Sequence, residues 1–119
     1  MSTQTAEQLS TKKCKACEGG VEKYTPEQAR EQIQSLDGWE LNDEATWIHK
    51  TWQAENFLAA VDFIHKIADA AEEEGHHPDL HLTGYRNIRV DLSTHAINGL
   101  SENDFILAAK IDQLPIQEK

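Results

Sequence analysis

The chain has 119 residues, of which 39% are hydrophobic and 27% are charged. This fits one folded globular domain and excludes a disordered or fibrous protein. Acidic residues outnumber basic ones by 21 to 11, giving a net charge of −10. That charge repels phosphate backbones and anionic lipid headgroups, so we expect neither nucleic acid nor a membrane as partner.

The chain carries no targeting signal that we can read. No run of about 18 apolar residues predicts a membrane span, and the first 13 residues lack the apolar segment of a secretory signal. Two cysteines cannot build a secreted disulfide framework. We therefore expect a cytoplasmic protein. A plastid location would require that a transit peptide had been removed.

Residues 1–24 are polar and aperiodic, and we predict a flexible N-terminal arm before a domain at 25–119. The arm contains Cys14-x-x-Cys17. The pair has three interpretations: a redox motif, half of a zinc ribbon, or a segment without a catalytic role. No predicted strand precedes it and no second pair follows, which favours the last.

The first elements of the domain are a short helix and a hairpin. Thr25 and Gln28 have the spacing of a capping box with Pro26 in the first turn, which predicts a helix to about Leu36. The stretch 39–52 is rich in β-branched and aromatic residues around a turn, which favours a β-hairpin.

A long amphipathic helix is predicted over about 55–74. Its apolar residues form one stripe at helical spacing: Phe57, Ala60, Val61, Ile64, Ile67, Ala68 and Ala71. Ala59, Phe63 and Ala70 widen the stripe beyond what a simple surface helix needs. We therefore expect one flank to pack on a sheet and the other on a second subunit.

The rest of the chain completes the order α-β-β-α-β-β-α. Gly75 ends the long helix, strands are predicted at 79–82 and 87–94, and Ser101 begins a helix that continues over 105–113. The predicted fold class is α+β, a four-stranded antiparallel sheet with helices packed on one face.

Histidines are the candidates for chemistry, because imidazole titrates near neutral pH. His76 and His77 follow the long helix directly, and His95 follows the last strand. If the last two strands form a hairpin, their outer ends meet. The three imidazoles would then converge on one cleft without a metal.

Two simpler interpretations compete with acid/base chemistry. His76, His77 and His95 with Glu72 have the right atoms for a zinc site, but adjacent histidines rarely reach one ion together. The other interpretation is that His76-His77-Pro78 is only a polar loop.

Over residues 25–114 the chain resembles the pterin-4a-carbinolamine dehydratase family. The resemblance rests on Glu72-x-x-x-His76-His77-Pro78, Tyr85, Ser93-Thr94-His95 and Gly99-Leu100-Ser101-Glu102-x-Asp104. It implies the predicted α+β order, a homodimer or homotetramer, and no metal or organic cofactor. The implied substrate is 4a-hydroxytetrahydrobiopterin or a related pterin, released by an aromatic amino acid hydroxylase and dehydrated to the quinonoid dihydropterin.

The resemblance also implies residue roles. His76 and His95 match the family's acid/base histidines, and His77 matches the one that mainly holds the pterin. Glu72 and Pro78 match the pocket edge, where Glu72 would bond the ring amides.

Two further positions match the substrate site. Thr94 would offer backbone contacts, and Asp104 would support the site by orienting His95.

Some positions depart from the animal branch of the family. Gly75 replaces an Asp, Leu80 a Trp and Asn103 an Arg. These differences resemble the bacterial or plant branch, and they bear on pterin affinity. A non-catalytic alternative exists on the same fold: a dimerisation cofactor for a transcription factor, or a Rubisco assembly factor. Retention of all three histidines favours catalysis.

Overall fold

The computed structural model describes residues 4–14 and 22–118. Its elements in chain order are α1 (Ala6–Ser10), α2 (Pro26–Ile33), β1 (Glu40–Leu41), β2 (Ile48–Gln53), α3 (Phe57–Glu74), β3 (Asp79–Thr83), β4 (Asn87–Leu92), the 3-10 turn η1 (His95–Ile97) and α4 (Glu102–Asp112). The predicted α+β class is confirmed. No helix within the described ranges is long and apolar enough to cross a membrane.

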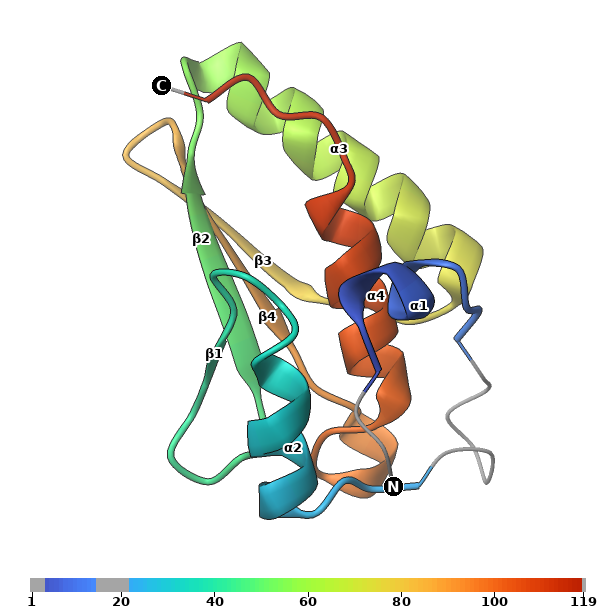
Figure 1. The fold of residues 1–119 in the computed structure, drawn as a ribbon. Coiled ribbons are helices and arrows are strands. Elements are labelled where there is room, and N and C mark those ends of the chain that lie inside the picture. The colour runs from blue at the N-terminus through green and yellow to red at the C-terminus, as the bar shows by residue number, and fades with distance from the viewer. Residues whose placement is uncertain (1–3, 15–21, 119) are drawn as a thin grey trace.

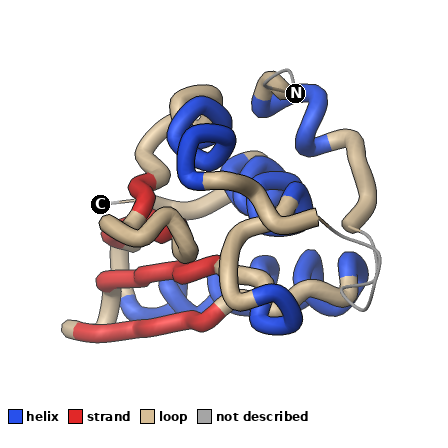
Figure 2. Tube along the Cα trace, turned by 90° about the horizontal axis from the view of Figure 1, so that it is seen from below, coloured by secondary structure: helices blue, strands red, loops and turns tan. Residues whose placement is uncertain are grey.

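The four strands form one antiparallel sheet in the order β1-β2-β4-β3. Both predicted hairpins are present, and pairing of β2 with β4 joins them (Figure 2). Ile88, Val90 and Leu92 alternate with more exposed residues along β4 and are buried. The predicted division into a buried and a wet face is thus confirmed.

Helices α3 and α4 lie side by side on the same side of the sheet (Figure 1). Asn56 caps α3 by accepting a hydrogen bond from the amide of Ala59, and Gly75 ends it in the left-handed conformation. The core face of α3 consists of Ala59, Ala60, Phe63, Ile67 and Ala71. Its other flank stays exposed, at 51% for Phe57, 78% for Leu58 and 43% for Val61.

Two predicted boundaries are wrong. Helix α2 ends at Ile33 rather than near Leu36, because the hydroxyl of Ser35 donates to the carbonyl of Gln32 and residues 34–36 continue as tight turns. Strand β4 ends at Leu92, because the hydroxyl of Ser93 turns away to the carbonyl of Thr46. His95 therefore begins η1, three residues beyond the end of β4, and does not directly follow the strand.

The N-terminal segment contains structure where none was predicted. Thr5 and Gln8 form a capping box, and α1 packs on α4 with Leu9 fully buried. Five residues are too short for a periodicity to be read from the sequence. Cys17 lies outside the described residues, so the Cys14-x-x-Cys17 interpretations and the domain boundary stay predictions.

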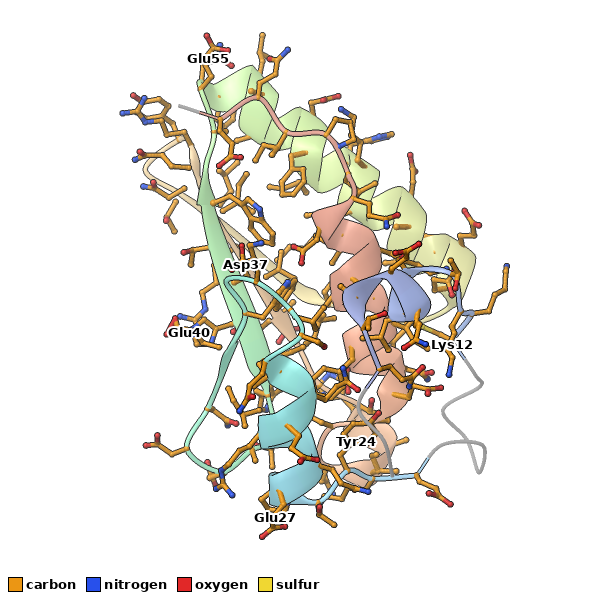
Figure 3. The ribbon with its side chains drawn as sticks, in the orientation of Figure 1. Lys12, Tyr24, Glu27, Asp37, Glu40 and Glu55 are labelled. Atoms are coloured by element: carbon orange, nitrogen blue, oxygen red, sulfur yellow. The ribbon has the colours of Figure 1, made fainter. Side chains whose placement is uncertain are left out.

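Residues on either side of the stretch 15–21 contact α4. The ammonium of Lys12 lies 3.1 Å from a carboxylate oxygen of Glu102. The ring of Tyr24 stacks on Phe105 with ring centroids 5.1 Å apart. Figure 3 labels both Lys12 and Tyr24 beside α4. Burial, with a smaller contribution from Glu102, raises the pKa of Tyr24 to about 12.

Candidate active site

His76 lies where α3 gives way to β3. Gly75 reverses the backbone with φ +66°, and the amide of His76 still donates to the carbonyl of Ala71, so the ring follows the helix end at a fixed angle. The residue is 4% exposed. Its Nε2 lies 2.6 Å from Oδ1 of Asp104, a charge-assisted distance.

Asp104 is fully buried in the first turn of α4. Its Oδ2 accepts hydrogen bonds from the hydroxyl of Thr94 at 2.8 Å and the amide of Ser101 at 3.0 Å. An ionised carboxylate only accepts, so Nε2 of His76 carries the hydrogen between them.

This arrangement corrects the expected role of Asp104. The sequence suggested that Asp104 orients His95, whereas the carboxylate contacts the ring of His76. The reason is the early end of β4, which places Thr94, and not His95, beside the first turn of α4.

His77 points to the surface and pairs with Glu72. Its Nε2 lies 2.5 Å from a carboxylate oxygen of Glu72, and the two side chains are 64% and 76% exposed. The predicted pocket-edge acid and the predicted pterin-holding histidine are therefore neighbours at the end of α3. Pro78, half-buried, leads from this pair into β3.

His95 is exposed at the start of η1 and contacts Trp47. The two rings meet edge to face, with centroids 5.6 Å apart and planes at 70°. Sequence reasoning missed Trp47, because a tryptophan at the start of a predicted strand is usually a packing residue.

The hydrogen-bond network runs from His76 through Asp104 to Thr94, the residue before His95. Thr94 is fully buried, and its hydroxyl also bonds that of Ser101 at 2.8 Å. The predicted backbone contacts of Thr94 with a pterin, and the convergence of the three imidazoles, stay predictions.

Other polar clusters lie elsewhere. A hollow of about 410 Å³ opens at the turn end of β3 and β4, the end opposite to His76, between residues such as Thr51, Gln53 and Arg89. In residues 4–14 and 22–118, no three His, Cys, Asp or Glu side chains are grouped to hold a metal ion.

A small α+β fold that holds a buried histidine–carboxylate pair, followed in the chain by an exposed histidine, defines a class of protein suited to proton transfer on a small molecule. The family model described as pterin 4 alpha carbinolamine dehydratase matches residues 22–114. The chain belongs to this family, whose named activity is that of a hydro-lyase.

Relatives with this name come from plants and bacteria. "Pterin-4-alpha-carbinolamine dehydratase 2, mitochondrial" of Arabidopsis thaliana is 47% identical over 113 residues, 92% of this chain and 60% of that protein. A Methylococcus capsulatus protein, named provisionally as a pterin-4-alpha-carbinolamine dehydratase, is 46% identical over 89% of this chain and 92% of its own length. The chain thus spans 60% of the plant relative and nearly all of the bacterial one.

A solved structure shares the fold. The "transcriptional coactivator/pterin dehydratase" of Brucella melitensis superposes with a TM-score of 0.71 at 31% identity, covering 76% of this chain and 96% of that one.

Proposed function

We propose that the protein dehydrates a 4a-hydroxytetrahydropterin to the quinonoid dihydropterin and water, with His76 and His95 as the acid/base pair. Family membership supports the reaction class and the pterin substrate. The observation that carries the residue assignment is the pairing of His76 with Asp104, one residue away from an exposed His77 and linked through Thr94 to His95.

The reaction needs one proton donor and one proton acceptor. The bond between C4a and the hydroxyl oxygen breaks while a proton reaches that oxygen, and water leaves. The proton on N5 is removed, and the electron pair of that N–H bond forms the C4a=N5 double bond. We assign proton acceptance to the imidazole of His76, because the carboxylate of Asp104 stabilises the imidazolium that results. His95 then donates to the leaving hydroxyl.

The exposed pair at the end of α3 is assigned to binding. His77 would stack on or hydrogen-bond the pterin, and Glu72 would accept from its ring amides. Both are surface-exposed, so they can reach a ligand without rearrangement of the core. The proposed supplier of the substrate is an aromatic amino acid hydroxylase, in keeping with recycling of the pterin. The cytoplasmic location is part of the proposal; the name of the Arabidopsis relative places that protein in mitochondria.

The proposal includes a homodimer or homotetramer that buries the exposed flank of α3. Phe57, Leu58 and Val61 are apolar, adjacent on the helix and more than two-fifths exposed. A second copy presents the same self-complementary stripe, as closed symmetric oligomers require.

The activity is tested by generating the 4a-hydroxytetrahydropterin in situ with a phenylalanine hydroxylase and following the quinonoid product by absorbance. Clear acceleration over the spontaneous reaction is expected. His76→Ala with His95→Ala should abolish it, and His95→Gln alone tests the donor at an exposed position where folding is not at risk. Turnover at the wild-type rate by the double variant would refute the assignment.

The alternative is a binding module. The "RuBisCO assembly factor" structure described as pterin dehydratase-like superposes with a TM-score of 0.53 at 20% identity, covering 63% of this chain and 86% of that one, which shows the fold alone. Absence of acceleration by folded wild-type protein would favour this alternative.

A further inference from the structure

Glu74 is a buried carboxylate at the last position of α3, two residues before His76. Its side chain is 2% exposed. One oxygen accepts from the ammonium of Lys110 at 2.7 Å, and the other accepts from the amide of Cys14 at 2.8 Å. Burial by itself would raise the pKa of Glu74, but these two donors outweigh it and the pKa is lowered.

Lys110 and Asp104 lie on the same helix, α4, six residues apart. At 1.5 Å per residue this separates them by roughly 9 Å along the helix axis. The end of α3 is thus joined to α4 at two points: Glu74 to Lys110, and His76 to Asp104. One link leaves the end of a helix free to rotate about it, whereas two separated links fix its orientation.

The N-terminal segment adds a third link. The amide of Cys14 bonds Glu74, and its thiol lies 3.6 Å from the carbonyl oxygen of Asn103, the residue before Asp104. Cys14 therefore contacts both helices next to the His76–Asp104 pair. Leu9, buried against the core, anchors the same segment.

We propose that Glu74 is a positioning residue for His76: with Lys110 and the amide of Cys14 it holds the end of α3 so that the His76 ring meets Asp104. The inference rests on the proposed function for its catalytic meaning. Its geometric part, the control of the His76–Asp104 hydrogen bond, stands without substrate.

The experiment compares Glu74→Gln and Lys110→Met with a matched control, Lys50→Met. Glu74→Gln can keep an acceptor for the Cys14 amide, but it removes the charge and the second acceptor, so the ion pair with Lys110 is lost. Lys50 has the same side-chain exposure as Lys110, 20%, and also pairs with a carboxylate at α4, that of Asp112 at 2.9 Å. It lies away from His76, in β2.

Two readouts are taken at a temperature where every variant is folded. In the dehydration assay, Glu74→Gln and Lys110→Met should lower kcat about tenfold with KM within about twofold of wild type, since misplacement of an acid/base group acts on the chemical step. Lys110→Arg, which keeps the cation, should retain most of kcat. Lys50→Met should keep kcat.

The second readout is the Nε2–H resonance of His76 in ¹⁵N-histidine-labelled protein, assigned by its loss in His76→Gln. It should shift or broaden in Glu74→Gln and Lys110→Met and stay in place in Lys50→Met. An unchanged resonance in the first two variants overturns the proposal, and so does an equal loss of kcat in Lys50→Met. If wild-type protein shows no dehydration, the proposed function fails, and the resonance alone decides whether Glu74 positions His76.

Discussion

Nε2 of His76 and Oδ1 of Asp104 lie 2.6 Å apart and join the end of α3 to the first turn of α4. Both residues are buried, so the hydrogen bond is shielded from solvent. It fixes the tautomer of the imidazole and links the histidine that follows one helix to the cap of another.

Asp104→Asn should therefore impair both folding and activity. The amide must present its NH2 group either to the His76 N–H or to the two donors on the other oxygen, which leaves buried donors facing each other. We expect a loss of about 2 kcal/mol in the free energy of unfolding and a fall in kcat of about a hundredfold. Urea unfolding and the dehydration assay measure the two effects. A variant with wild-type kcat would contradict the role given to Asp104.

Glu72→Gln should affect binding more than chemistry. The residue is 76% exposed and contacts His77, so its replacement leaves the core intact. We expect KM for the pterin to rise about tenfold, as loss of one charge-assisted hydrogen bond implies, with kcat nearly unchanged. Glu73→Gln, exposed on the neighbouring position, serves as the control. A fall in kcat without a change in KM would assign Glu72 to the chemical step instead.

Stability should depend on pH through Glu74. Because the pKa of Glu74 is lowered in the folded state, its contribution is present above the ordinary carboxyl pKa and is lost as the pH falls through the folded-state pKa. Glu74→Gln should thus lose less stability between pH 7 and pH 3 than wild type does. Urea midpoints at the two pH values test this. Equal losses in both proteins would be evidence against a lowered pKa.

Cys14 should react slowly. Burial, followed by the nearby carboxylate of Glu74, raises the pKa of its thiol to about 12. The thiolate is the reactive form, so alkylation by iodoacetamide at pH 8 should be at least about a hundredfold slower than for an unperturbed thiol. Peptide mass mapping follows Cys14 specifically, and urea-unfolded protein gives the reference rate. Comparable rates in folded and unfolded protein would show that the segment does not shield the thiol.

The exposed flank of α3 should determine the oligomeric state of the protein in solution. Leu58→Asp places a charge on the most exposed of the three apolar residues, so it should disfavour self-association without affecting the monomer core. Wild type is expected to sediment as a dimer or tetramer at micromolar concentration, and the variant at a reduced mass. Gln34→Glu, exposed at the end of α2, is a control for added charge. A monomeric wild type would refute the interface.

The sequence predicted the regular elements well where the periodicity was long or the caps were explicit. The β4 alternation, the Gly75 end of α3 and the Ser101 cap of α4 are examples. The same helix pattern placed His76 and His77 directly after the long helix. Local patterns of this kind depend on neighbours in the chain, which the sequence displays directly.

Contacts between residues that lie far apart in the chain were harder to predict. The assignment of Asp104 to His95 was wrong because it depended on where β4 ends, and Ser93 ends it through a carbonyl 47 positions away. Helix α1 was missed because its stability comes from burial of Leu9 rather than from its own five residues. The Glu74–Lys110 pair is likewise a long-range contact, and no spacing of residues in the sequence predicts it.

Gly75 carries a last consequence. A Cβ built at this position meets nothing within 4 Å, so a side chain there is opposed only by the left-handed backbone. Aspartate and asparagine tolerate that conformation better than other residues do. Substitution by aspartate should therefore cost little stability and leave the path of the chain unchanged. It would add one negative charge next to His76 in the chain. The charge around His76 can therefore be changed at position 75 without a change in the backbone.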